Sequence, residues 1–186
     1  MRLRGAVLLL LFGALAGGCG ALDGPARLAG LPLPDPATLP CCWQSQEQVW
    51  VSTADGELNL GAAVAVRGGT LTVVVLDPMG RRLVTLIQGA GDVQTLDAPP
   101  AWSGALSHQL LLAIYLHHLT AEQWRLGDPA WSLAADSGHK SLAYRGRELV
   151  RLDYLEEGTQ EPFDRAVEFR GQGISLRIGT LSRTAL

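Results

Sequence analysis

The sequence predicts a mainly β protein with a short helical insertion: a curved antiparallel sheet of about 10–11 strands that forms a half-open barrel. Three observations predict it. Apolar residues alternate with polar or small residues over residues 57–67, glycine-containing turns separate many short apolar runs, and a single helix-like apolar region lies after residue 103. At 186 residues with 47% hydrophobic residues, the chain is long enough for one domain with a real core.

The N-terminal segment has the pattern of a bacterial lipoprotein signal. Arg2 and Arg4 precede an apolar run, residues 5–15, that is too short to span a bilayer. We therefore expect a signal peptide over residues 1–18. Small residues follow and lead to Cys19, which resembles the acylated cysteine of a lipobox. A plain secretory cleavage with an incidental cysteine is the alternative. Because residue 20 is not Asp, the resemblance to sorting signals favours the periplasmic face of the outer membrane.

Residues 19–40 are rich in Pro and Gly without periodicity, so we expect the lipidated N-terminus to continue as a tether, followed by one domain over residues 41–186. Cys41 and Cys42 begin that domain. Adjacent cysteines are a poor metal pair, and a bond between them closes a strained ring. We therefore expect packed or reduced thiols, with a vicinal disulfide as the alternative.

The first half of the domain has the clearest strand pattern. Side chains at every second position from Leu58 to Val66 are apolar, so one face of that strand is apolar. Gly68-Gly69 favours a tight hairpin, and residues 77–80 fit a turn with Pro at the second position and Gly at the fourth. The predicted strands of this half are residues 43–51, 57–67, 70–76, 82–88 and 93–96.

One helix separates the two halves. Pro99-Pro100 ends the preceding strand, Ser103 can cap a helix that runs to about Leu119, and Thr120 with Gln123 forms a capping box for a second short turn. The helix is apolar around most of its circumference, so we expect it to be buried on the concave side of the sheet. The predicted strands of the second half are residues 131–135, 140–144, 148–155, 163–169 and 174–178.

Charge and motifs exclude several functions. The net charge is −3, and removal of residues 1–18 takes away Arg2 and Arg4 but no acid, which leaves −5. Nucleic-acid binding is therefore not expected. No nucleophile elbow, Walker loop or Cys-x-x-Cys is present, and His117-His118 lacks the spacing of a metal pair. We expect neither an enzyme nor a cofactor or metal.

The turn at residues 77–80 carries a family resemblance. The apolar strand Leu71–Leu76, then Asp77-Pro78-Met79-Gly80, a further strand, and Gly91-Asp92-Val93-Gln94-Thr95-Leu96 resemble LolB, the outer-membrane lipoprotein receptor of the LolA/LolB superfamily. The order of later elements agrees over roughly residues 43–180. The helix sequence differs from LolB and is closer to a LolB-like group of bacterial lipoproteins, some of which accompany clusters that make aryl polyene lipids.

The resemblance implies an acyl-binding function. An exposed sixteen-carbon chain costs roughly 12 kcal/mol, at about 0.8 kcal/mol per CH₂, so a carrier must offer comparable apolar surface. The half-barrel would offer a trough if its helix does not fill it; the alternative is that the same residues are simply core. The expected ligand-binding residues are Leu58, Leu60, Val64, Val66, Leu71, Val73, Val75, Leu110, Ile114 and Trp131.

The turn residue Met79 is expected to be exposed. In LolB the matching turn carries a Leu that touches the membrane, and Arg81 and Arg82 beside Met79 could meet lipid phosphates. The bland alternative is a side chain folded back onto the sheet.

Two functions follow from the sequence. The first is an outer-membrane lipoprotein that binds acyl chains and receives or inserts lipoproteins or lipids, with a periplasmic carrier protein as a further partner. The second is a scaffold or accessory factor, for example for aryl polyene lipid export, that binds a protein partner and transports nothing.

Overall fold

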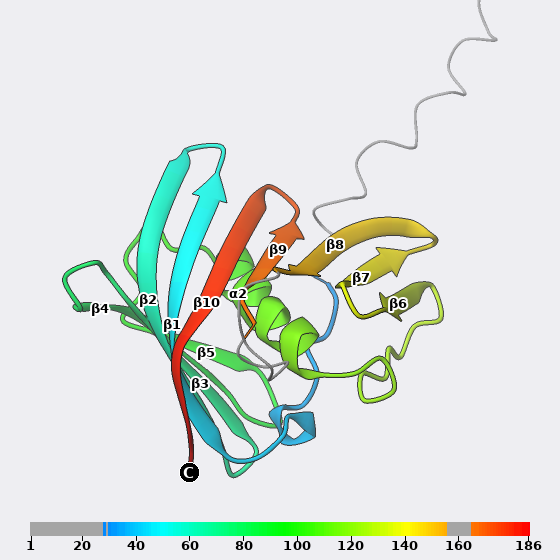
Figure 1. Cartoon of the computed structure of the whole chain (residues 1–186), viewed down its shortest axis with the longest axis horizontal. Coiled ribbons are helices and arrows are strands. Elements are labelled where there is room, and N and C mark those ends of the chain that lie inside the picture. The colour runs from blue at the N-terminus through cyan, green and yellow to red at the C-terminus, as the bar shows by residue number, and fades with distance from the viewer. Residues whose placement is uncertain (1–27, 29, 156–164) are drawn as a thin grey trace, which may run out of the picture.

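A computed structural model describes residues 28, 30–155 and 165–186, and shows ten antiparallel strands in one curved, unclosed sheet with a single α-helix (Figure 1). The predicted fold class is confirmed. The expected signal peptide, Cys19 and residues 156–164 lie outside the described residues. Within the described residues, no helix is long and apolar enough to cross a membrane.

The elements in chain order are the 3₁₀-helix η1 (Pro36–Thr38), β1 (Trp43–Thr53), β2 (Gly56–Arg67), β3 (Thr70–Leu76), β4 (Arg82–Gln88), β5 (Val93–Leu96), α2 (Gly104–His118), β6 (Trp131–Ala135), β7 (His139–Tyr144), β8 (Arg147–Tyr154), β9 (Val167–Gly171) and β10 (Ile174–Ala185). The strands lie in the sheet in the order β5-β4-β3-β2-β1-β10-β9-β8-β7-β6. The two strands that flank the helix in sequence, β5 and β6, are therefore the two edges of the sheet, and the chain crosses the concave face through α2 between them (Figure 1).

The alternation predicted for β2 is confirmed from Leu60 onward. Leu60, Ala62, Val64 and Val66 are buried, and the residues between them face outward. Gly68 and Gly69 turn the chain into β3 with φ of +57° and +71°, the left-handed conformation that a tight hairpin needs at both central positions.

Several strand boundaries differ from the sequence prediction. β9 spans Val167–Gly171 rather than residues 163–169, of which 163–164 lie outside the described residues. β10 extends to Ala185 rather than ending at residue 178, because Trp43 pairs with Ala185 and β1 supports the strand along its whole length. The predicted capping box of Thr120 and Gln123 is present, with backbone-to-side-chain distances of 2.9 and 3.3 Å, and the predicted short turn follows it.

Helix α2 fills the concave side of the sheet. Its N-cap is Ser103 as predicted, and the Ser103 side chain accepts a hydrogen bond from the Leu106 N–H at 3.1 Å. Buried residues lie on all sides of the helix, because the sheet wraps around it. The side chains that it adds to the core include Leu110, Leu111, Leu112, Ala113, Ile114, Tyr115 and Leu116.

The end of the predicted tether is part of the domain, which corrects the expected boundary. We call residues 30–40 together with Leu28 the strap. Leu28, Leu31 and Leu39 are buried in the same core as the strands. The Gln88 amide donates to the Pro34 carbonyl at 3.0 Å, and a His108 ring nitrogen lies 2.8 Å from the Leu31 carbonyl.

Cys41 and Cys42 directly precede β1 and are joined by a disulfide. The expectation of packed or reduced thiols is wrong, and the alternative weighed against it holds. Cys41 is exposed and Cys42 is half-buried, so neither is a packed core residue.

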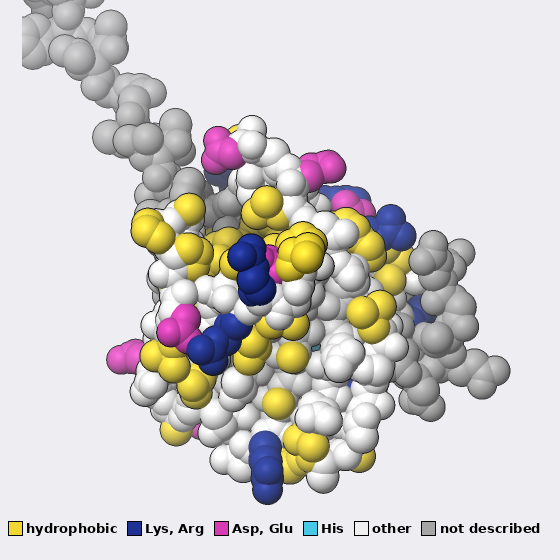
Figure 2. Space-filling model, turned by 90° about the vertical axis from the view of Figure 1, so that its left-hand side faces the viewer, with side chains coloured by type: hydrophobic (Ala, Val, Ile, Leu, Met, Phe, Trp, Pro, Cys, Tyr) yellow, Lys and Arg dark blue, Asp and Glu magenta, His cyan; other side chains and the backbone are white. Residues whose placement is uncertain are grey.

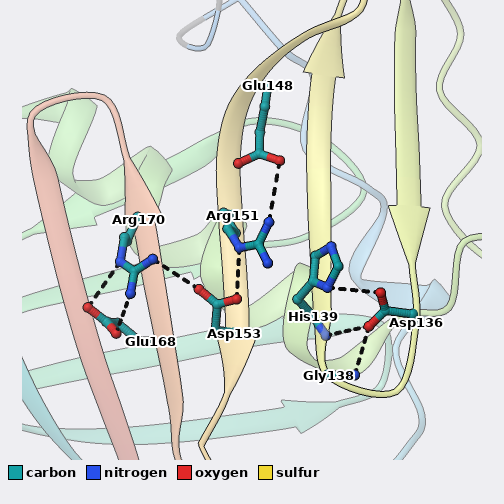
Figure 3. Close-up of polar contacts among 8 residues, drawn as sticks. All are labelled: Asp136, Gly138, His139, Glu148, Arg151, Asp153, Glu168 and Arg170. Carbon is teal, nitrogen blue, oxygen red and sulfur yellow. Dashed lines mark hydrogen bonds and ion pairs between the residues drawn. The ribbon is translucent and has the colours of Figure 1, made fainter.

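The outer face of β8 and β9 is a solvated network of ion pairs (Figure 3). Asp153 accepts from Arg151 at 2.8 Å and from Arg170 at 3.2 Å, and Arg170 also pairs with Glu168 at 2.8 Å. Exposed pairs of this kind contribute little to stability, so we read the network as the water-facing side of the half-barrel.

Candidate functional site

One end of the half-barrel carries the exposed apolar side chains of Leu58, Met79 and Leu96 and the half-buried Trp102, which together we call the rim. The antiparallel order places them together, because β2 starts, β3 ends, β4 starts and β5 ends at this end of the sheet. Leu58, Met79 and Leu96 are 57%, 81% and 45% exposed. From the side at which Figure 1 labels β4, hydrophobic side chains reach the surface beside basic and acidic ones (Figure 2).

The β3–β4 turn holds Met79 outward. The Asp77 carboxylate accepts from the backbone N–H groups of Met79 and Arg81, both at 2.9 Å, and Gly80 takes φ +77°. The Arg81 N–H above all, with the Arg81 side chain and the Met79 N–H, lowers the pKa of Asp77. The predicted exposure of Met79 is therefore confirmed, and its position does not depend on a flexible loop.

The two arginines beside Met79 are exposed but paired. Arg81 Nε lies 2.7 Å from Asp77, and Arg82 lies 3.0 Å from Asp97. Both members of the Arg82–Asp97 pair are exposed, and such pairs are typically worth ~0–1 kcal/mol. In the other pair Arg81 is exposed, whereas the Asp77 side chain is only 10% exposed.

Below the rim, a purely apolar cavity of about 20 Å³ lies between α2 and the sheet. We call it the rim cavity. Leu58 and Trp102 stand at its border, Leu106 and Leu110 of α2 form one wall, and Val49, Val51, Leu60, Ala62 and Val75 form the other. The Trp102 indole N–H donates to the Ser107 hydroxyl at 2.8 Å, which fixes the ring against the start of α2.

A second cavity of about 30 Å³ lies at the other end of α2. His117, His118, Glu47 and Trp43 are among its lining residues, and the rings of Trp43 and His118 are 4.6 Å apart. Burial lowers the pKa of His118 well below its usual value, and nearby His117, Arg183 and Lys140 lower it further.

Lys140 of β7 caps the C-terminal end of α2. Its ammonium donates to the carbonyls of Leu116 and Leu119 at 2.8 Å and of His117 at 3.3 Å. Burial lowers the pKa of Lys140 to about 8. Since these carbonyls have no partner inside the helix, Lys140 fixes the C-terminal end of α2. The N-terminal end of α2 borders the rim.

In the space between α2 and the sheet, the predicted ligand-binding residues do not line an open trough. Neither cavity approaches the ~300 Å³ of a pocket for a drug-sized ligand; each has room for one or two waters. The side chains that the structure brings together as closed core are Leu60, Val64, Val66, Leu71, Val73, Val75, Leu110 and Ile114.

The remaining two predicted residues lie elsewhere. Leu58 is on the inner face of β2 but beyond the core, at the rim. Trp131 is half-buried on edge strand β6, five strands from β1, and its ring packs against Tyr144 at 5.0 Å. Trp131 is therefore not part of the same site.

Sequence reasoning missed the strap and the residues that hold it. The Tyr115 hydroxyl donates to Gln88 Oε1 at 2.9 Å, and the Gln88 amide in turn holds Pro34. The leucines of the strap were visible in the sequence, but Pro and Gly conceal any periodicity. Within the described residues, no group of three or more His, Cys, Asp or Glu could hold a metal ion.

Comparison with known proteins gives one family. Residues 44–182, which span β1 to most of β10, match a family model described as a protein of unknown function (DUF3261). No curated protein matches the chain.

Proposed function

Because the chain belongs to the DUF3261 family of proteins of unknown function, we propose a function from its geometry: it is a lipid-anchored protein at the periplasmic face of the outer membrane that contacts the bilayer through its rim and receives acyl chains there. The observation that carries this proposal is the exposed Met79, held outward by Asp77 at the end of the barrel where the rim cavity lies. The acyl chains belong to lipids or to lipoproteins.

The rim supports reversible contact with a membrane. Burying a Met or Leu side chain is worth ~1.5–3 kcal/mol, and a basic residue at an anionic surface adds ~1 kcal/mol. Met79 and Leu58 with Arg81 and Arg82 give a marginal affinity of this kind, and stable attachment needs a second signal such as an acylated Cys19.

An acyl chain can enter the space between helix and sheet only if α2 separates from β1 and β2, because the rim cavity is far too small. The arrangement favours separation at the N-terminal end of α2. Leu106 and Trp102 are only half-buried there, whereas Lys140 holds the C-terminal end. Burial of a sixteen-carbon chain, at about 0.8 kcal/mol per CH₂, offsets the loss of contacts between helix and sheet.

The test is delivery of an acylated probe. The full chain, anchored in donor vesicles, is mixed with a fluorescent triacylated lipopeptide and with acceptor vesicles of phosphatidylethanolamine and phosphatidylglycerol. We expect Met79→Glu to lower the delivery rate several-fold, because a carboxylate at the tip opposes contact with the anionic acceptor. Folding should be intact, since Met79 is exposed.

The matched control is Leu181→Glu, a change from exposed leucine to the same acid on β10, away from the rim. It should deliver at the wild-type rate. Equal rates for Met79→Glu and the wild type, with both proteins folded, would overturn the membrane contact.

The filled interior favours a second candidate function. Because the two cavities are closed by side chains, the same fold also fits a scaffold that binds a protein partner without carrying lipid. Native mass spectrometry of the protein purified from membranes separates the two. Non-covalently bound acyl chains support the carrier, and a protein with only its covalent anchor supports the scaffold.

A further inference from the structure

Strand β6 presents an unpaired edge. Among the residues that the structure describes, it is the last strand in the sheet order and β7 is its only neighbour. The Arg145 N–H donates to the Ala130 carbonyl at 2.7 Å, and the Asp136 N–H donates to the His139 carbonyl at 2.9 Å. In an antiparallel pair such rows alternate, so Ser132 and Ala134 also bond towards β7. The backbone groups of Trp131, Leu133 and Ala135 therefore point away from the sheet.

This edge lacks the features that protect edge strands. Natural edges are blunted by charged residues, by proline or by bulges, whereas β6 contains only Trp, Ser, Leu and Ala and has a regular register with β7. The opposite edge, β5, has Asp92 and Asp97 directly at its two ends, and Asp97 is paired with Arg82. If β5 paired antiparallel with β5 of a second copy, Asp92 of one copy would lie near Asp97 of the other. The same pairing of β6 brings no like charges together.

We infer that β6 pairs antiparallel with β6 of a second copy of this chain, centred on Leu133, so that the two sheets become continuous. In this register Leu133 exchanges two backbone hydrogen bonds with Leu133 of the second copy, and the Ala135 N–H donates to the Trp131 carbonyl on each side. The Trp131 N–H needs no new partner, because it donates to the Asp128 carbonyl at 3.0 Å.

The charges at both ends of β6 fit this register. Asp136 of one copy then lies opposite Ala130 of the other, and Arg145 is the next residue in the same row. A long arginine side chain can reach an acid across the short Ala130. Asp136 is held in place by the N–H groups of Gly138 and His139, both at 2.8 Å (Figure 3), and these bonds lower the pKa of the Asp136 carboxyl. The two-fold axis makes the contact twice.

Cysteine cross-linking of the full chain in its membrane tests the register. Residues paired across the axis have Cα atoms about 5.5 Å apart, within the range of a disulfide. Leu133→Cys should therefore form a covalent dimer on mild oxidation. In this register Ser132 lies opposite Ala134 of the second copy, so the Cα atoms of the two Ser132 residues are about 8 Å apart. Ser132→Cys should therefore cross-link far more weakly.

A second variant tests the interface without a new cysteine. Ala134→Lys places a charge on an exposed position of β6 and should convert the detergent-solubilised full chain from dimer to monomer in sedimentation velocity. Gln94→Lys, an exposed position on edge strand β5, is the matched control and should leave the dimer intact.

Three results would overturn the inference. One is a wild-type chain that sediments as a monomer at tens of micromolar, which would leave the edge to a strand of another protein. Another is equal cross-linking at Ser132 and Leu133. The third is a dimer that Gln94→Lys disrupts and Ala134→Lys does not, since that result would place the contact at β5.

Discussion

At the scale of single residues, two buried polar sites inside the half-barrel affect stability: the Tyr115–Gln88 hydrogen bond and the His118 ring. Tyr115 and Gln88 form a buried hydrogen bond whose second partner is the strap. His118 is packed against Trp43 and is surrounded by positive charge from His117, Arg183 and Lys140. Of the two, His118 makes stability depend on pH.

Acid should destabilise the protein through His118. The folded protein keeps this ring neutral because its pKa is lowered, whereas the unfolded chain takes up a proton near pH 6.5. The contribution of His118 is therefore complete above about pH 6.5 and is lost as the pH falls, by at most ~1.4 kcal/mol per pH unit. Urea unfolding between pH 7.5 and 5 measures this slope.

The variant that tests it is His118→Phe, which keeps an aromatic ring against Trp43. Its free energy of unfolding should change less than that of the wild type over the same pH range. If the two slopes agree, the acid sensitivity comes from other groups.

At the scale of elements, the strap is held by the same kind of burial as the strands. Leu39 is buried against the core although it lies in a Pro-rich segment that was expected to be a free tether. Truncation of a leucine lowers the free energy of unfolding strongly if the segment is packed and hardly at all if it is a free tether. One substitution therefore distinguishes the two.

We expect Leu39→Ala to lower the free energy of unfolding by about 2–5 kcal/mol, the usual cost of a large-to-small change in a core. Leu186→Ala, at an exposed leucine, should change it by less than ~0.5 kcal/mol. Chemical denaturation of the full chain measures both. A cost for Leu39→Ala as small as that of the control would show that the strap does not support the domain in solution.

The elements also show where sequence reasoning ends. The alternation in β2 and the Asp77–Gly80 turn predicted a buried face and an exposed Met79, because both depend on local periodicity and turn chemistry. The strap and the end of β10 were missed because their order comes from partners distant in sequence: Gln88 and His108 for the strap, and β1 for β10. An open and a filled trough have the same alternation, so periodicity could not separate them.

At the scale of the whole molecule, the two ends of α2 face different surroundings. The N-terminal end borders the rim, and the C-terminal end is held by Lys140 of β7. The strap lies along this axis, since Leu31 is bonded to His108 in the first half of the helix and Ala37 contacts the β2–β3 hairpin at Gly69. The chain therefore enters the domain at the end of α2 that borders the rim.

The length of the segment between Cys19 and Leu28 should then control the rate at which the protein delivers acyl chains to vesicles. If Cys19 carries the anchor, only nine residue steps separate it from Leu28, which span at most about 30 Å. We expect an insertion of twenty Gly and Ser residues after Gly24 to lower the vesicle delivery rate, with no change in the free energy of unfolding. An unaltered rate would mean that the anchor does not position the rim.

If Cys19 carries a lipid anchor, the strap shortens the flexible segment between the bilayer and the domain. A flexible line that ended at residue 40 would have twenty-one steps from Cys19 rather than nine. Since the local concentration of a tethered body falls with about the −3/2 power of tether length, the shorter line raises the concentration of the rim at its own membrane roughly three- to fourfold. With Leu31 and Leu39 buried in the core, a domain anchored at Cys19 would stay within reach of one bilayer and out of reach of any surface more than a few tens of ångströms away.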